Sequence, residues 1–153
     1  MKQSCLALAV LALGASGASA LEVTKQVPAA AAPDKVWAAI GDFCGIAKWH
    51  PAVEKCTSET KDGVLMRTLS LKGGGAILEK QVKRDDAAMS YTYAIIESPL
   101  PVANYVSTIS VAKASAGSTI TWTGKFDAKG APDAKAMEVM GGIYDAGLAA
   151  LAK

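Results

Sequence analysis

Residues 132–151 read PDAKAMEVMGGIYDAGLAAL, and this stretch decides the fold. A proline opens it, and apolar residues then recur at intervals of three and four, which predicts one long amphipathic helix over the whole range. Gly141, Gly142 and Gly147 interrupt the pattern, although each glycine costs about 1 kcal/mol relative to alanine inside a helix. They indicate either that the sheet or a bound molecule approaches the helix backbone closely, or that the helix is loosely packed or kinked. The apolar stripe comprises Ala136, Met137, Val139, Met140, Ile143, Tyr144, Leu148 and Leu151.

Six segments with period-two alternation precede this helix, and Gly, Asp or Ser residues separate them. Their short turns, KDG, KGGG, DDA and ASAG, join antiparallel neighbours, so the segments predict a meander. Leu21–Val27 also alternates apolar and polar residues and adds a seventh strand. The six segments are Ala52–Thr60, Val64–Leu71, Ala76–Arg84, Met89–Glu97, Tyr105–Ala112 and Ser118–Phe126.

Two short helices are expected between the first and second strands. A Pro-Asp pair at 33–34 opens the first, in which apolar residues keep a helical spacing until Gly41 ends it. The second runs from about Cys44 to Trp49 and is closed by Pro51. These elements bury their apolar faces most simply when a strongly curved antiparallel sheet grips the long helix. The predicted class is therefore α+β, with a space between the concave face of the sheet and the helix.

The first twenty residues have the three-part layout of a secretory signal peptide. Lys2 supplies the positive charge, Cys5–Leu13 is an apolar run, and residues 18–20 read Ala-Ser-Ala. The run is far shorter than the roughly 20 residues of a membrane-spanning helix, and no later stretch is long enough. We therefore expect residues 1–20 to be removed, residues 21–153 to form one domain, and the protein to be periplasmic or secreted, without stable membrane insertion.

The composition excludes several functional classes. Sixteen Lys and Arg against 14 Asp and Glu leave a formal charge of +2, which is too small and too dispersed for binding nucleic acid through its phosphates. Once Cys5 is removed with residues 1–20, one histidine and two separated cysteines are a poor ligand set. No phosphate-binding glycine loop is present either, so we expect no metal and no cofactor. In an oxidising compartment Cys44 and Cys56 are able to pair. The alternative is two buried free thiols, because sequence spacing does not fix the Cα separation.

Five segments together carry a family resemblance. They are PDKVWAAIGDFCGIAKWHPAV (33–53), RTLSLKGGGAILEKQV (67–82), YTYAIIESPLPVANYVSTISV (91–111), ITWTGKFDAKG (120–130) and GIYDAGLAALAK (142–153). In this order they resemble the polyketide cyclase/dehydrase and lipid-transport-like branch of the START-related superfamily (SRPBCC), which shares its helix-grip fold with the birch pollen allergen. The resemblance implies a hydrophobic cavity between sheet and terminal helix that holds lipids, sterols, polyketides or hormones. A minority of members catalyse cyclisation, dehydration or condensation there, so the fold leaves the reaction open.

A charged pair is predicted on the hairpin that turns at residues 72–74. A three-residue connection places Arg67 opposite Glu79. The pair lies either at the cavity wall, where it orients a polar group of the ligand or serves as acid and base, or in solvent, where it is worth less than about 1 kcal/mol. At the next hairpin, the two turn lengths place Tyr93 or Ala94 opposite Glu79.

Aromatic and polar side chains complete the expected wall. If Tyr93 faces Glu79, then Tyr91, Tyr93, Ile95 and Glu97 share one face, although ordinary strand packing also favours tyrosine. The full set of expected ligand-binding residues is Trp49, Arg67, Leu69, Glu79, Tyr91, Tyr93, Glu97, Trp122, Met140 and Tyr144.

His50 is the only histidine, and so the only side chain whose ordinary pKa is near neutral. A catalytic role requires a carboxylate partner such as Glu79 or Glu97 within hydrogen-bond reach, and otherwise His50 is an exposed or capping residue. The candidate catalytic residues are therefore Arg67, Glu79, Tyr93 and His50.

The leading hypothesis is an exported carrier of one small hydrophobic or aromatic molecule, because the sequence assembles no catalytic set. The rival is a cyclase/aromatase-type enzyme that uses the candidate catalytic residues on an enolisable polyketide-like substrate. It requires these groups to converge in one pocket. A third hypothesis is a module that binds a partner through its outer surface, for which the sequence offers no clear apolar patch. The identity of the ligand and the oligomeric state stay open.

Overall fold

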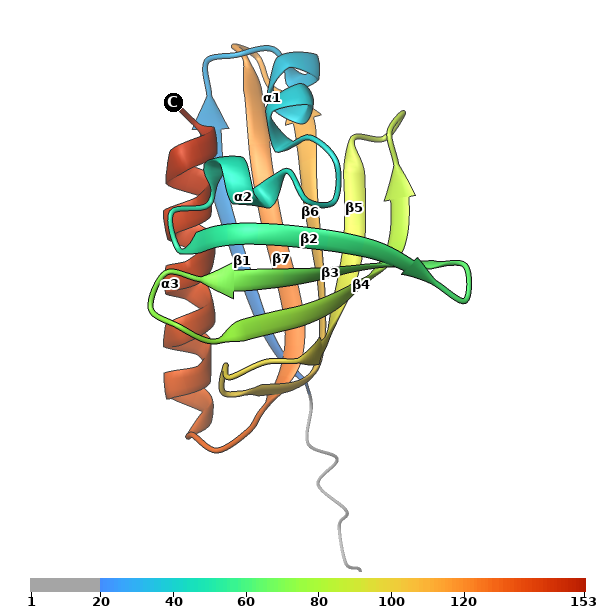
Figure 1. The fold of residues 1–153 in the computed structure, drawn as a ribbon. Coiled ribbons are helices and arrows are strands. Elements are labelled where there is room, and N and C mark those ends of the chain that lie inside the picture. Colours follow the sequence, from blue (N-terminus) through green and yellow to red (C-terminus); the bar gives the residue numbers. More distant parts are fainter. Residues whose placement is uncertain (1–19) are drawn as a thin grey trace, which may run out of the picture.

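The computed structural model describes residues 20–153 as one curved sheet with two short helices and one long helix (Figure 1). The expected signal peptide lies outside the described residues, apart from Ala20. The elements are β1 (Leu21–Ala29), α1 (Pro33–Ile40), α2 (Ile46–Trp49), β2 (Val53–Lys61), β3 (Val64–Leu71), β4 (Ala76–Asp85), β5 (Ser90–Glu97), β6 (Val102–Lys113), β7 (Ser118–Ala128) and α3 (Asp133–Leu151).

All seven strands form a single sheet in the order β1-β7-β6-β5-β4-β3-β2, and every neighbouring pair is antiparallel. Strands β2 to β7 follow one another as the predicted meander, and β1 pairs with β7. In Figure 1, β2, β3 and β4 run across the direction of β1, β7 and α3, so the sheet is strongly bent. The predicted α+β helix-grip architecture is confirmed.

Register shifts help to explain how the sheet bends. Leu78 pairs with Glu97, but the next residue, Glu79, pairs with Ile95, so Ile96 is an extra residue in β5. Such a bulge bends its strand and increases the local twist. Because side chains alternate between the two faces, the extra residue moves Glu97 to the exposed outer face. The expectation that Glu97 shares the cavity face is therefore wrong.

Helix α3 packs along the concave side of the sheet, mainly against β1 and β7. Most of the predicted apolar stripe faces the core, but Met137 is 39% exposed and does not belong to it. No helix among residues 20–153 is long and apolar enough to cross a membrane. The buried residues of α3 are Ala136, Met140, Gly141, Tyr144, Gly147, Leu148 and Leu151.

The helix glycines differ in what surrounds them. A Cβ atom on Gly147 would lie 2.7 Å from Cδ2 of His50, 2.8 Å from Cζ3 of Trp122 and 3.0 Å from Cζ3 of Trp49. A Cβ atom on Gly142 would meet no side chain or other element of residues 20–153 within 4 Å. Close approach to the helix backbone is therefore the reason for glycine at 147, and the approaching groups are the protein's own aromatic side chains.

The segment of α1 and α2 is tied to the sheet. Cys44, which precedes α2, forms a disulfide with Cys56 of β2, and their Cα atoms are 5.5 Å apart. Nε1 of Trp49 donates a hydrogen bond to the carbonyl oxygen of Ile40 at 3.2 Å, which fixes α2 against the end of α1. In Figure 1 both helices lie at the same end of the bent sheet as the C-terminal end of α3.

Candidate functional site

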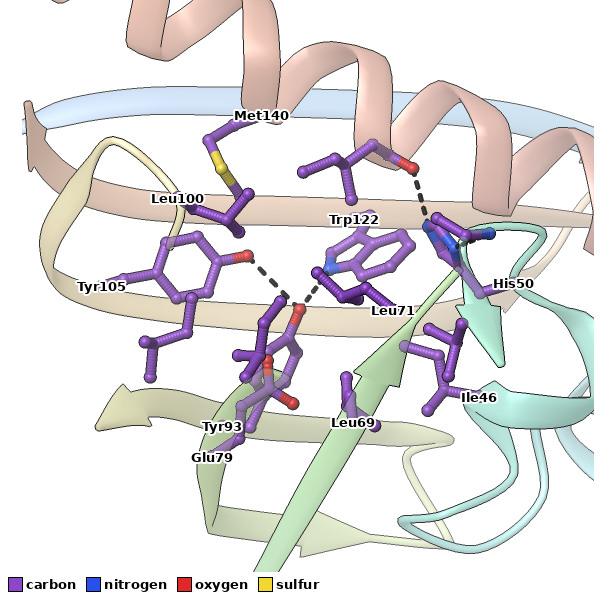
Figure 2. A pocket seen from close by; sticks show the side chains of 15 residues that line it. Ile46, His50, Leu69, Leu71, Glu79, Tyr93, Leu100, Tyr105, Trp122 and Met140 are labelled. Atoms are coloured by element: carbon purple, nitrogen blue, oxygen red, sulfur yellow. Dashed lines mark hydrogen bonds between the residues drawn. The ribbon is translucent and has the colours of Figure 1, made fainter. Parts of the chain in front are cut away.

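A cavity of about 220 Å³ lies between the concave face of the sheet, α2 and α3 (Figure 2). Aliphatic and methionine side chains from α2, β2, β3, β4, β5 and α3 make up most of its wall, among them Leu69 and Met140. The polar or aromatic lining side chains are His50, Glu79, Tyr93, Tyr105 and Trp122. The predicted space between sheet and helix is therefore present, and it is apolar with a few convergent polar groups.

A buried ion pair stands at the sheet side of the cavity. Arg67 faces Glu79 across the β3–β4 hairpin, as predicted, and its Nε lies 2.5 Å from Oε2 of Glu79. The side chains are 0% and 5% exposed, so the solvated alternative is wrong. Glu79 lines the cavity, whereas Arg67 lies behind it. Burial raises the pKa of the Glu79 carboxyl, and the charge and hydrogen bond of Arg67 oppose that rise.

The Arg67 guanidinium is held from several sides. Nη1 donates to the carbonyl oxygen of Phe43, and the Phe43 ring covers the guanidinium, with its centroid 4.1 Å from Cζ. The Tyr93 ring centroid is 5.0 Å from Cζ. Among residues 20–153 Nη2 has no hydrogen-bond partner, and aromatic rings lie close to the guanidinium instead. The charge that holds Glu79 in place therefore depends on the segment just before Cys44.

The register of the next hairpin differs from both expectations. Glu79 pairs with Ile95, rather than with Tyr93 or Ala94, because the pairing shifts at two places between β4 and β5. Tyr93 pairs with Gln81 instead. Its side chain still faces the cavity, since the shift at Ile96 lies beyond it on the strand.

A chain of hydrogen bonds runs from the cavity into the wall behind it. Nε1 of Trp122 donates to Tyr93 Oη at 3.1 Å and to Ser107 Oγ at 3.0 Å. The hydroxyl oxygens of Tyr93 and Tyr105 are 3.3 Å apart, and those of Tyr105 and Tyr144 are 2.5 Å apart. Tyr144 also lies 3.2 Å from Ser107. In Figure 2 the hydroxyls of Tyr93 and Tyr105 and the indole nitrogen of Trp122 point toward one another.

Burial keeps these phenols protonated. It raises the pKa of Tyr93 and of Tyr105 well above the ordinary value, and it raises the pKa of Tyr144 to about 12. The Trp122 ring, which lines the cavity, stacks on the Tyr144 ring at a centroid distance of 4.6 Å. The hydroxyls therefore act as neutral hydrogen-bonding groups near neutral pH.

His50 uses both ring nitrogens within the protein. Its Nδ1 accepts from the backbone N–H of Ala52 at 3.2 Å, so its Nε2 carries the hydrogen and donates to the carbonyl oxygen of Ile143 at 3.0 Å. Burial lowers the pKa of His50, the Arg67 charge lowers it further, and the bond to Ile143 opposes this. Among residues 20–153 no carboxylate is hydrogen-bonded to His50, so the ring joins α2 to α3 as a neutral imidazole.

Comparison with known proteins now identifies the family. Residues 20–153 match the family described as polyketide cyclase / dehydrase and lipid transport. The chain belongs to this family. No curated protein matches the sequence.

Solved structures of similar chains support the assignment to the polyketide cyclase / dehydrase and lipid transport family. XoxI from Bacillus cereus is 32% identical, with a TM-score of 0.79, over 86% of this chain and 92% of that one. An uncharacterised protein from Bacillus thuringiensis is 31% identical, with a TM-score of 0.80, over 86% and 96%. The ZhuI aromatase/cyclase from Streptomyces sp. R1128 is 21% identical, with a TM-score of 0.68, over 86% and 91%, and shares the fold.

Some of the predicted site residues line the cavity of this family member, and others do not. The lining does not include buried Arg67, Tyr91 and Tyr144 or half-buried Trp49, and Glu97 points outward. No three His, Cys, Asp or Glu side chains of the described chain gather into a metal-binding group. The predicted residues that do line the cavity are His50, Leu69, Glu79, Tyr93, Trp122 and Met140.

The sequence interpretation missed Tyr105, one of the polar groups of the cavity wall. Together with Ser107, Ile109 and Val111 it occupies every second position of β6, and all four are buried on one face. This period-two signal is visible in the sequence. Leu100 was missed for a different reason, since it lies in the loop between β5 and β6, where no periodicity indicates a direction.

Proposed function

We propose that this protein is an exported carrier that binds one small, largely apolar molecule in the cavity between sheet and helix. The observation that carries the proposal is the cavity itself, an apolar space of about 220 Å³ whose polar groups sit on a rigid, hydrogen-bonded wall. A space of this kind excludes water from an apolar ligand and orients it through a few polar contacts.

The volume sets the size of the ligand. An apolar cavity of about 150 Å³ takes up benzene, so by proportion 220 Å³ accommodates about nine non-hydrogen atoms. This corresponds to a fused pair of small rings or a substituted single ring. Sterols and long fatty acids exceed it unless the wall moves.

Binding is favoured over catalysis because the candidate acid and base groups are already engaged. Both nitrogens of His50 are hydrogen-bonded within the protein, and Glu79 is held by Arg67. Burial raises the pKa of Tyr93 well above 10.0, so its phenol is a weak acid and no phenolate is available as a base near neutral pH. These groups are arranged to hold a ligand rather than to exchange protons with it.

Two observations support export. The first twenty residues have the layout of a signal peptide. Cys44 and Cys56 are joined as a disulfide, which is the form expected in an oxidising compartment. A fusion of residues 1–30 to a reporter that is active only outside the cytoplasm tests this part, and an inactive reporter would contradict it.

Calorimetric titration with bicyclic aromatics, medium-chain fatty acids and sterols tests the binding function. We expect saturable 1:1 binding of the compounds with about nine or ten non-hydrogen atoms, from the volume argument above. In a Leu69→Trp variant the larger side chain fills the cavity, so binding should be lost while the fold is retained. Thr68→Trp is the matched control, because this neighbouring side chain lies on the opposite face of β3. Failure of every compound to bind, or equal binding by both variants, would refute the proposal.

A further inference from the structure

In the hydrogen bonds of the cavity wall, the donor and the acceptor of each pair follow from the contacts of Ser107. Its Oγ lies 2.8 Å from the carbonyl oxygen of Thr123, which is able only to accept, so the single hydroxyl hydrogen of Ser107 points there. Ser107 therefore accepts from its two other partners, Nε1 of Trp122 and the hydroxyl of Tyr144.

This assignment also decides which hydroxyl donates in each contact between the tyrosines. Tyr144 gives its hydrogen to Ser107, so at the 2.5 Å contact Tyr105 is the donor and Tyr144 the acceptor. The hydrogen of Tyr105 is then engaged, so at the 3.3 Å contact Tyr93 donates to Tyr105. Each hydroxyl hydrogen points away from the ligand space. Tyr93 and Tyr105 therefore present only lone pairs to a ligand, and lone pairs accept hydrogen bonds.

The remaining polar side chains of the wall follow the same rule. The N–H of Trp122 is shared between Tyr93 and Ser107. The Nε2 hydrogen of His50 is donated to the Ile143 carbonyl oxygen of α3. Oε2 of Glu79 accepts from Nε of Arg67, and the guanidinium charge, which is permanent, favours the carboxylate form of Glu79, whose oxygens only accept. Arg67 itself stands behind the wall.

We propose that the cavity selects an aromatic ligand that donates a hydrogen bond through a neutral N–H or O–H group, and discriminates against one that offers only an acceptor. This rests on the proposed binding function and narrows its ligand class. A ligand donor placed near Glu79 and Tyr93 forms hydrogen bonds with their buried acceptor atoms. A ligand acceptor at the same place faces only lone pairs and is left without a hydrogen bond. Turning the Tyr93 hydrogen toward such a ligand breaks its bond to Tyr105 and leaves the Glu79 carboxylate facing the same ligand.

Three ring systems of nearly equal shape test the proposal by calorimetric titration of the purified protein. Indole has an N–H donor, indene has no polar atom, and benzofuran has an acceptor oxygen. Indole is the most polar of the three, so burial of apolar surface alone would bind it most weakly. We expect indole to bind at least about tenfold more tightly than indene, as for a buried hydrogen bond to a charged acceptor, and benzofuran to bind most weakly.

Ser107→Ala tests whether the hydroxyl chain sets this preference. Without Ser107 the hydrogens of Tyr144, Tyr105 and Tyr93 are free to reverse, and Tyr93 then presents a donor to the cavity. The preference for indole over benzofuran should fall several-fold, while the affinity for indene stays unchanged. Tyr144→Phe breaks the same chain and should act alike. Ser110→Ala is the control, because Ser110 lies on the same strand and faces the outside of the sheet.

The outcomes separate this proposal from the function on which it rests. Binding of indene and benzofuran as tightly as indole would overturn the donor preference and leave the carrier function intact. An unchanged preference in both Ser107→Ala and Tyr144→Phe would overturn the role of the hydroxyl chain. Failure of all three compounds to bind would overturn the carrier function and the preference together.

Discussion

Replacing Gly147 with alanine should destabilise the protein, although alanine is the better helix former. The added Cβ would lie 2.7, 2.8 and 3.0 Å from ring atoms of His50, Trp122 and Trp49, where real Cβ atoms are essentially never found below 3.0 Å. These three rings contact one another, with centroid distances of 5.8 to 6.0 Å, and each donates a hydrogen bond within the protein, so none moves without disturbing the others. Either the ring cluster or the helix must therefore shift.

The magnitude follows from three contributions. Overpacking of a close-packed site costs about 1–3 kcal/mol. Displacement of His50 weakens its hydrogen bond to the Ile143 carbonyl, which is worth about 1 kcal/mol. Helix propensity returns about 1 kcal/mol. The expected net loss in the free energy of unfolding at Gly147→Ala is about 1–3 kcal/mol.

Gly142→Ala is the matched control in the same helix. In the described part of the chain its Cβ would meet nothing within 4 Å, so only helix propensity acts, and stability should rise by about 0.5–1 kcal/mol. Urea unfolding followed by tryptophan fluorescence measures both variants, with an unchanged dependence on urea as the check for two-state behaviour. Stabilisation by Gly147→Ala, or equal effects of the two substitutions, would refute the close packing of α3 on the three rings.

Three further predictions concern the charged and covalent contacts around the cavity. Burial lowers the pKa of His50 below its ordinary value of 6.5, so unfolding takes up a proton; stability is complete above about pH 6.5 and falls as the pH drops toward the lowered value. His50→Gln should flatten this part of the stability profile. A wild-type profile without any fall there would contradict the lowered pKa of His50. Glu79→Leu leaves the Arg67 charge unpaired and should cost about 3–5 kcal/mol in urea unfolding, whereas adding Arg67→Met should recover much of it; a double variant no better than the single one would argue against the ion pair. Reducing the Cys44–Cys56 disulfide with a dithiol should lower the free energy of unfolding by about 3 kcal/mol, and equal stability with and without reductant would contradict a constraint on the unfolded chain.

The sequence predicts much of the architecture because periodicity records which face of an element is buried. Period-two segments and short turns specify the antiparallel meander, and the helical stripe specifies the gripped helix. The pairing of Arg67 with Glu79 also follows from the sequence, because the connection at residues 72–74 fixes the register of one hairpin.

The composition of the site is less predictable because bulges change which face a residue occupies. Ile96 is an extra residue that turns Glu97 outward, and nothing in the alternation of YTYAIIE marks it. The role of His50 depends on the carbonyl of Ile143, which lies 93 residues later in the chain, and no local pattern records such a contact.

A crystal structure of the protein grown with saturating indole is the most direct test of the central claim. We predict one indole molecule in the space between the sheet and α3, in contact with Leu69 and Met140, with its nitrogen directed to Glu79 or Tyr93. An interior closed by rearranged side chains, with indole absent or bound only on the outer surface, would contradict the claim.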